Sequence, residues 1–505
     1  MSTQKHNFRV LFLYPNTMMA TLLPINISLL HACVRDAGYD TRLFDTTFYR
    51  TEEINFEMKK VELLQIKRFD YAETGVRFKE TDLFDDLEEV IDSYKPDLIA
   101  ITIVQDTFDL AVQMITRIRN RNIPTVAGGV FVTFSPEDVI AVDGIDYVCI
   151  GEGEEAIVEL CRGLEAGEPV DTIRNLWIKA PQGIIKNPLR KPVNLDVLPF
   201  IDYDIFEKER IFRPMQGNIY AMIHIELDRG CPYQCTYCCA PELKRIYREY
   251  AGAAYYRQKS IRRIINEMKF LKDRYDAKYI NFNSETFLAR PIEDLREFSE
   301  LYRKEIGLPF WCQTRPETVN EEKIRLLKEM GCRNAQFGIE CGNEEFRKHV
   351  LQRNYTNEHI LTAAGLLEKY GIDYTVNNII GFPGETRELI CETISINRQI
   401  SPGTMNVYLF TPYKGTRLYQ YCVDHGYLDA DAQVHQLLDS TELKGQPLSH
   451  SELKGLQRTF PLYATFPESE FDRIRTAERF DDTGNTMFEE LKKEFYEKVF
   501  RLPVS

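Results

Sequence analysis

Three cysteines near the middle of the chain are spaced like the ligands of a metal cluster. In the stretch CPYQCTYCC, Cys231, Cys235 and Cys238 follow the pattern C-x3-C-x2-C. Three thiolates alone do not complete a tetrahedral zinc site. They suit three corners of a cubane iron–sulfur cluster, whose fourth iron then takes a ligand from outside the protein. The spacing therefore predicts a [4Fe–4S] cluster with one open iron.

A zinc site and a disulfide are the alternative interpretations of these cysteines. Zinc would need a fourth ligand, which Cys239 or His224 would supply. We expect Cys239 to be a packed small residue instead, because adjacent cysteines rarely bind one metal together. A disulfide would require an oxidising compartment. Apart from this group the 12 cysteines are scattered singly, and the first residues lack the apolar core of a signal peptide, so we expect a cytoplasmic protein.

The cysteine motif resembles that of the radical S-adenosylmethionine (SAM) superfamily. In that superfamily the methionine part of SAM occupies the open iron, and one electron from the cluster cleaves SAM to a 5′-deoxyadenosyl radical. Tyr237, directly before the third cysteine, matches an aromatic residue that these enzymes place next to the adenine. The resemblance implies an enzyme, and it implies an external electron donor of the flavodoxin or ferredoxin type.

Alternating strands and helices are expected around the motif. The stretch 221–227 is predicted as a strand that leads through Asp228-Arg229-Gly230 into the cysteine loop. Five further strands are predicted at 279–282, 310–315, 334–340, 374–381 and 405–410. Together they predict a partial (β/α)6 barrel that is open on one side for substrate. Active sites of such barrels lie at the carboxyl ends of the strands.

Polar residues follow these strand ends at the positions where the radical SAM family binds SAM. The resemblance implies that the segment 283–285 holds the methionine amino group, that Gln313 and Arg315 hold the carboxylate, and that Glu340 contacts the ribose. The loop GFPGET would lie along the adenine. The SAM-binding residues implied in this way are Tyr237, Asn283, Ser284, Glu285, Gln313, Arg315, Glu340, Gly381, Pro383 and Gly384.

The first 160 residues predict a separate doubly wound, Rossmann-like parallel sheet. Residues 8–14 are a short, nearly all-apolar stretch, as expected for a parallel strand buried on both faces. Four further strands are predicted at 39–44, 97–104, 124–127 and 146–150, with helical patterns between them. Residues 50–85 are expected to be an insertion with a helical second half. In such folds ligands bind at the carboxyl ends of the strands.

Two glycine-rich loops follow strands of this first region. The stretches AGGVFVTFSPEDV and DYVCIGEGEEA resemble the cobalamin-binding domain found ahead of many radical SAM enzymes. Phe131 stands where that family usually has a histidine. The resemblance implies a cobalamin contacted by Asn16, Thr102, Gln105, Asp106, Gly128, Gly129, Val130, Phe131, Gly151, Glu152 and Gly153.

The sequence also bears on how cobalamin would bind. The motif Asp-x-His-x-x-Gly, which supplies a histidine to cobalt in methionine-synthase-like domains, does not occur. We therefore expect that no histidine of this domain binds the cobalt. The alternatives are a sheet that has lost the cofactor and only supports the barrel, or a dinucleotide site, which the absence of G-x-G-x-x-G after the first strand disfavours.

Length and charge set the domain plan and the class of partner. The 505 residues suffice for about three domains of ~150 residues each. We expect a cobalamin-binding domain at 1–160, a linker at 161–215, the radical SAM barrel at 216–430, and a helical C-terminal region at 431–505 with helices at 432–440, 449–460 and 486–500. The net charge of −14 disfavours nucleic acid as a partner. No apolar run approaches the ~20 residues of a membrane span.

The basic, tyrosine-rich stretch 244–263 has two interpretations. It would grip a phosphate or nucleotide, or it is a solvated helix face with buried tyrosines, which we favour.

The combined prediction is an α/β cobalamin-dependent radical SAM enzyme. We expect methylation of an unactivated carbon of a small-molecule or lipid-like substrate. One alternative is a radical SAM enzyme that couples or cyclises its substrate, with cobalamin in another role or absent. The other is a non-enzymatic iron–sulfur or zinc protein.

Overall fold

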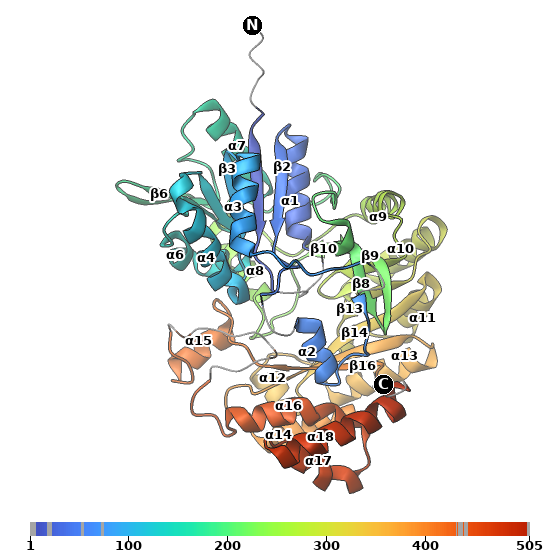
Figure 1. The fold of residues 1–505 in the computed structure, drawn as a ribbon. Helices are drawn as coiled ribbons and strands as arrows, with labels where there is room; N and C mark the ends of the chain where they lie inside the picture. The colour runs from blue at the N-terminus through green and yellow to red at the C-terminus, as the bar shows by residue number, and fades with distance from the viewer. Residues whose placement is uncertain are drawn as a thin grey trace.

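Two seven-stranded sheets, each covered by helices, form the body of the protein (Figure 1). The computed structural model describes residues 7–17, 23–51, 55–71, 75–430, 432, 438 and 443–501. The N-terminal sheet and the curled second sheet lie one above the other, and the last helices pack below the second sheet. The predicted α/β class is confirmed.

The first sheet has the strand order β2-β1-β3-β4-β5-β6-β7. Its parallel strands are β1 (Arg9–Tyr14), β2 (Asp40–Asp45), β3 (Leu98–Thr102), β4 (Thr125–Gly128) and β5 (Tyr147–Cys149). Helices α1 (Ile25–Asp36) and α7 (Glu154–Ala166) cover one face, while α3 (Leu83–Tyr94) and α4 (Phe108–Ile118) cover the other. Short helices α5 (Val130–Phe134) and α6 (Pro136–Ile140) follow β4. The doubly wound prediction is confirmed.

Two segments of the N-terminal half differ from expectation. In the 50–85 insertion, helix α2 (Phe56–Glu62) lies in the first half and the next helix begins only at Leu83, so the helical second half was wrong. The side chain of Asn55 caps α2, and that of Asp82 caps α3. In the expected linker, β6 (Leu176–Ala180) and β7 (Gly183–Lys186) form a hairpin that adds to the first sheet, because β6 pairs antiparallel with β5.

The second sheet is a partial barrel with the order β16-β15-β14-β13-β12-β9-β8. Its six parallel strands are β9 (Asn218–Glu226), β12 (Tyr279–Asn283), β13 (Phe310–Thr314), β14 (Cys332–Glu340), β15 (Asp373–Ile380) and β16 (Thr404–Leu409). Strand β8 (Phe212–Met215) pairs antiparallel with β9 at one edge. The (β/α)6 prediction is confirmed.

Helices cover the outside of the barrel, and the cysteine loop lies between β10 (Asp228–Arg229) and α8 (Ala240–Ala251). Strand β10 pairs with β11 (Arg257–Gln258). The remaining helices of this part are α9 (Ile261–Tyr275), α10 (Ile292–Glu305), α11 (Glu321–Met330), α12 (Glu344–His349), α13 (Asn357–Lys369), α14 (Arg387–Asn397) and α15 (Arg417–Asp424).

The insertion of the first sheet crosses to the open side of the barrel. Gln65, just after α2, donates a hydrogen bond to the carbonyl oxygen of Val407 on edge strand β16 (2.9 Å). Gln457 on the C-terminal helix α16 donates to the same oxygen (3.2 Å). Figure 1 shows α2 beside β16 and the C-terminal helices. The unpaired edge of the sheet is therefore covered by chain from both ends of the sequence.

The C-terminal helices are α16 (His450–Thr465), α17 (Phe471–Ala477) and α18 (Asp482–Phe495). The guanidinium of Arg387 on α14 pairs with Glu478 and ties them to the barrel. The helices expected at 449–460 and 486–500 are confirmed in substance, and the helix expected at 432–440 lies outside the described residues. No helix in the described ranges is long and apolar enough to cross a membrane.

An aromatic cluster holds the outer layer of the barrel together. The ring of Phe282 stacks on that of Phe310 with centroids 4.2 Å apart, and it meets the edges of Phe287, Phe298 and Tyr302.

We predict that Phe282→Ala lowers the free energy of unfolding by about 3–5 kcal/mol, because it leaves a cavity in a fully buried cluster. Urea unfolding of the purified proteins measures this, with Tyr250→Ala, at a side chain 65% exposed, as the control. Equal destabilisation by both variants would contradict the packing described.

Candidate functional site

The three motif cysteines lie on one loop at the carboxyl end of β9, above the barrel. Cys235 is buried, and Cys231 and Cys238 are partly buried. Burial raises the pKa of Cys231 to about 11, and the neighbouring Cys238 and Cys235 contribute to the rise, so the three thiols lie within electrostatic range of one another. Lys244 on α8 braces the loop by donating to the carbonyl oxygens of Pro232 (2.8 Å) and Tyr233 (2.7 Å).

The arrangement of the thiols distinguishes between the metal interpretations. Within the described part of the chain, no three His, Cys, Asp or Glu side chains converge so as to hold one metal ion. In a [4Fe–4S] cluster each thiolate binds a different iron, so its ligands do not converge on a point. His224, the alternative zinc ligand, is fully buried inside the barrel and bonds Asn281 (2.8 Å). The buried and hydrogen-bonded position of His224 argues against its use as the fourth ligand of a zinc site at the cysteine loop.

Arg315, at the end of β13, faces the cysteine loop. Its Nη1 donates to Sγ of Cys235 (3.1 Å), and its guanidinium lies 3.8 Å from the ring centroid of Tyr233. Its Nε pairs with Glu317 (2.6 Å). A guanidinium in this position stabilises negative charge nearby, whether on a sulfur or on a carboxylate that lies against the loop. The carboxylate-binding role of Arg315 stays a prediction, since its partners in the structure are Cys235 and Glu317.

Tyr237 and Glu340 are brought together by a residue that the sequence did not single out. Nη1 of Arg353 donates to the hydroxyl of Tyr237 (2.6 Å) and pairs with Oε1 of Glu340 (3.0 Å). Glu340 itself has the left-handed backbone angle φ +60° at the point where β14 and β15 lose register. The structure thus fixes both predicted side chains beside the cysteine loop, and the stretch LQRNY that contains Arg353 carries no pattern that would have identified it.

The segment after β12 presents its polar groups to a cavity. The side chains of Asn283 and Glu285 are exposed there, and Gln313 lines the same wall. Desolvation raises the pKa of Glu285, which has no hydrogen bond or ion pair in the part of the chain that is described. Ser284 instead donates to Asp228 (2.7 Å), whose pKa burial raises to about 7. The carboxylate of Glu285 therefore lines the cavity without a cationic partner among the described residues, and its role toward SAM stays a prediction.

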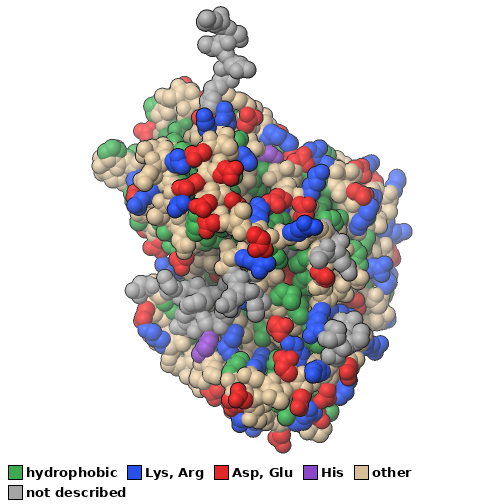
Figure 2. All heavy atoms as spheres, in the orientation of Figure 1, with side chains coloured by type: hydrophobic (Ala, Val, Ile, Leu, Met, Phe, Trp, Pro, Cys, Tyr) green, Lys and Arg blue, Asp and Glu red, His purple; other side chains and the backbone are tan. Residues whose placement is uncertain are grey.

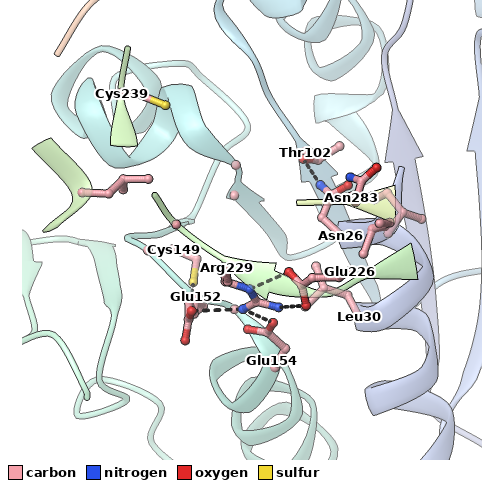
Figure 3. A pocket seen from close by; sticks show the side chains of 18 of the residues that line it. Asn26, Leu30, Thr102, Cys149, Glu152, Glu154, Glu226, Arg229, Cys239 and Asn283 are labelled. Atoms are coloured by element: carbon pink, nitrogen blue, oxygen red, sulfur yellow. Dashed lines mark hydrogen bonds and ion pairs between the residues drawn. The ribbon is translucent and has the colours of Figure 1, made fainter. Parts of the chain in front are cut away.

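The cavity joins the two sheets and has a volume of about 470 Å³. At one end lie the two glycine loops of the first sheet, at 128–129 and 151–153. At the other end lie Cys238, Asn283, Glu285, Trp311 and Gln313. Figure 3 shows it between α1, the glycine loops and the strands of the barrel. Cys239, expected to be a packed residue, lines this cavity next to Cys238.

The end within the first sheet fits a cobalamin. Its walls are apolar, with side chains from β1, β3, β4, α1 and α7, among them Phe12, Leu30, Val126 and Leu160. Two positions of the loops require glycine: a Cβ on Gly129, where φ is +113°, would lie 2.5 Å from the carbonyl oxygen of Ile103, and one on Gly151, where φ is +77°, would overlap the hydroxyl of Tyr247. An apolar slot under glycine loops at the carboxyl ends of parallel strands suits a long nucleotide tail.

The predicted cobalamin residues divide into two groups. Thr102, Gly128, Gly129, Gly151, Glu152 and Gly153 line the cavity. The other five, which do not line it, are Asn16, Gln105, Asp106, Val130 and Phe131. Phe131 packs on Phe108 in the core, Asn16 bonds Thr47, and Val130 is exposed. Gln105 accepts a hydrogen bond from the backbone of Lys414 (2.8 Å) and Asp106 one from Tyr413 (3.1 Å), so both dock the barrel instead.

The adenine-loop residues Gly381, Pro383 and Gly384 form a turn above β15. The backbone N–H groups of Gly381 (2.6 Å) and Phe382 (3.2 Å) donate to Glu385, whose pKa burial raises to about 8. The ring of Phe382 lies 6.1 Å from that of Tyr237. The loop thus lies beside the tyrosine that the sequence predicts to contact adenine.

A buried arginine ties the two sheets together at the cavity. Arg229 pairs with Glu226 of the barrel (2.9 Å) and with Glu152 (3.0 Å) and Glu154 (2.7 Å) of the glycine loop (Figure 3). Burial acts to lower the pKa of Arg229, but the three glutamates raise it well above its ordinary value. Arg257 also pairs with Glu152. The sequence indicated a structural role for Arg257, which with Ser260 matches a pattern of the family, but it did not indicate the ion pairs of Arg229.

Comparisons with known proteins agree with this architecture. A family model of the radical SAM superfamily matches residues 225–395, and a model of the B12 binding domain matches residues 17–161. The chain is 28% identical over 350 residues to an uncharacterised methyltransferase of Pyrococcus horikoshii, covering 68% of this chain and 73% of that protein. It is 24% identical over 428 residues to a hopanoid C-3 methylase of Methylococcus capsulatus, covering 81% and 71%.

The fold is also similar to a solved structure. The radical SAM methyltransferase TsrM from Kitasatospora setae, with cobalamin and a [4Fe–4S] cluster bound, aligns with a TM-score of 0.62. The sequences are 16% identical, and the alignment covers 97% of this chain and 99% of TsrM. The two proteins therefore share the whole order of cobalamin domain, barrel and C-terminal helices.

We predict that Arg315→Ala weakens SAM binding by about 2 kcal/mol, because a charge-assisted hydrogen bond to the carboxylate is lost. Equilibrium dialysis of SAM against the cluster-containing protein measures this. Arg325→Ala, on α11, removes an exposed arginine that pairs with Glu329 and serves as the control. Unchanged affinity in Arg315→Ala would restrict this residue to holding the cysteine loop.

Proposed function

Because the chain belongs to the cobalamin-dependent radical SAM enzymes with a B12-binding domain ahead of the barrel, we propose that it methylates an unactivated carbon of its substrate. The observation that supports this is the single cavity that runs from the glycine loops to the cysteine loop. Its two ends have the residues to hold two different cofactors. A substrate bound at the barrel mouth lies between them.

The cofactors of such an enzyme are a [4Fe–4S] cluster, SAM and cobalamin. When bound, these cofactors would supply two things: a 5′-deoxyadenosyl radical, which removes a hydrogen atom from the substrate, and a methyl group, which is carried on cobalt. Together they allow methylation of a carbon that is not nucleophilic. In this chain Cys231, Cys235 and Cys238 would hold the cluster. Glu285 would bind the ammonium of SAM and Arg315 its carboxylate. The glycine loops at Gly129 and Gly153 would admit the cobalamin.

The protein's own contribution is position and exclusion of water. The Arg229 ion cluster holds the glycine loop at a fixed place against the barrel, so the two cofactor regions keep one separation. The cavity walls shield reactive species from solvent. Lys244 and Arg315 hold the cysteine loop from two sides. An electron donor of the flavodoxin or ferredoxin type would reach the loop from the exposed side, where Pro232 and Gln234 are solvent-accessible.

Two relatives carry methyl transfer in their names, and the structural neighbour is a methyltransferase. Two other relatives, 24% and 23% identical, are named anaerobic magnesium-protoporphyrin IX monomethyl ester cyclases, so the names of the relatives support both reactions and the products must decide between them. The products distinguish the two: methylation consumes a second SAM and yields S-adenosylhomocysteine with 5′-deoxyadenosine, whereas the alternative yields 5′-deoxyadenosine alone.

We predict that the anaerobically reconstituted protein holds about four irons in its cluster and that Cys235→Ala abolishes SAM cleavage. The reason is that the loss of one thiolate leaves the cluster incompletely held. Chromatography of 5′-deoxyadenosine after reduction with dithionite measures cleavage. Cys391→Ala, at an exposed cysteine on α14, should cleave SAM like the wild type. Full cleavage in Cys235→Ala would refute the cluster assignment.

We also predict that no histidine of this domain binds the cobalt of bound cobalamin. The domain lacks the Asp-x-His-x-x-Gly motif, and Phe131, at the usual histidine position, is packed in the core. Electron paramagnetic resonance of the cob(II)alamin form should show no hyperfine splitting from a histidine nitrogen. Labelling the histidines with ¹⁵N provides the control, because it would change the splitting of any such ligand and leave this spectrum unaltered.

A further inference from the structure

The inner face of the barrel is unusually polar below the strand ends. On β9, Ile223 and Ile225 point outward into the core under the helices, so His224 and Glu226 point inward. The same alternation turns at least one amide inward on each of the next five strands. Five of these amides are Asn281 on β12, Gln313 on β13, Gln336 on β14, Asn377 on β15 and Asn406 on β16.

These amides retain unused hydrogen-bonding capacity. Gln313 and Gln336 are paired in register on adjacent strands, and their side-chain amides have no hydrogen-bond partner in the described part of the chain. Asn406 donates to Asn377 (2.8 Å), but its own Oδ1 is buried without a partner. Oδ1 of Asn281 and Nε2 of His224 are likewise buried and unpartnered. Buried polar groups are normally satisfied, so this surface is built to contact a polar molecule.

A second feature lies at the two edges of the sheet, where α2 spans the gap. Arg213 on β8 is paired with Tyr220 of β9, so the two side chains lie on the same face of the sheet. The ring of Tyr220 lies 5.2 Å from that of Tyr279 on β12, measured between centroids, and this face is the inner one. Lys60 on α2 points to β16, where its Nζ lies 3.5 Å from the hydroxyl of Tyr408. Tyr408 also faces inward, because Val407 and Leu409 belong to the outer core.

The charges at this place do not balance among the described residues. Arg213 is partly buried and has no hydrogen bond or ion pair there. Burial lowers the pKa of its guanidinium, and Glu57 is the only carboxylate that acts to raise it. Glu57 is buried, and both Arg213 and Lys60 act on its pKa, so one carboxylate is shared by two cations. The nearby Arg210 is already paired with Asp45 (2.8 Å). Among the described residues, the two cations Arg213 and Lys60 thus have a single carboxylate, Glu57, to balance them.

We propose that Arg213 and Lys60 bind an anionic group of the substrate, a carboxylate or a phosphate, at the α2 side of the barrel interior. This rests on the proposed function, since it names the kind of substrate that the same site takes. The planar guanidinium offers two donors to either oxyanion, and Lys60 supplies a point charge. The arc of amides then binds the polar remainder. The substrate is thus a polar, anionic small molecule and not a hydrocarbon lipid.

Inorganic phosphate and sodium acetate are suitable probes, because they carry the charged group alone. The reconstituted wild type is first tested for release of 5′-deoxyadenosine from SAM. Isothermal titration of the same preparation with each probe should then show saturable binding to one site. Arg213→Gln and Lys60→Met should each weaken it at least about tenfold, as expected when a charge partner is removed. The probe that binds with the higher affinity indicates whether the substrate carries a phosphate or a carboxylate.

Arg333→Gln is the matched control, because it removes an exposed arginine from β14 of the same sheet and should leave the affinity unchanged. Lys60→Met, on the partly buried face of α2, tests the site independently should Arg213→Gln fold poorly. A wild type that cleaves SAM but binds neither probe, or binds equally in all variants, overturns the anion site alone. A wild type that does not cleave SAM overturns the proposed function.

Discussion

The buried ion cluster around Arg229 is the constraint on which the arrangement of the two sheets depends. A guanidinium removed from water must have its charge matched close by, and here the matching carboxylates come from both sheets: Glu226 from the barrel, Glu152 and Glu154 from the glycine loop. Removing one partner of such a cluster typically costs about 3–5 kcal/mol. A shift of one sheet against the other therefore breaks several charge-assisted bonds at once. The shape of the cavity follows from this fixed contact.

The same contact explains why the glycine loop can serve a ligand. Glu152 holds Arg229 and Arg257 with its side chain, while its backbone N–H donates to the hydroxyl of Tyr247 on α8 (2.8 Å). Tyr247 lies on α8, the helix that begins directly after the cysteine loop. One residue of the cobalamin domain is thus bonded on both sides to the part of the barrel that carries the cysteines. The two cofactor regions are positioned by shared atoms, with no long linker between them.

Much of the fold could be predicted from the sequence, because the strands buried on both faces are short apolar runs and the functional loops follow them directly. Gly129 was identified because only glycine suits a backbone with a positive φ that closely approaches a neighbouring strand. Arg353 and Gln65 were not identified, since each acts through a partner that is distant in sequence, Tyr237 or Val407. The hairpin β6–β7 was missed because its residues look like a linker until β5 offers an edge for pairing.

The insertion at 50–85 shows how a segment without a local motif acquires a role from its position. A partial barrel leaves β8 and β16 with unpaired edges, and an uncovered edge would expose the interior to water and to other chains. Helix α2 covers this gap and brings Glu57 and Lys60 to a place where Arg213 already points inward. Helix α2 is joined to the first sheet rather than to the barrel, so it is separate in the chain from the strand ends at which we propose that SAM binds. We therefore expect the strand ends to serve the chemistry, and the chain that closes the open side to select the substrate.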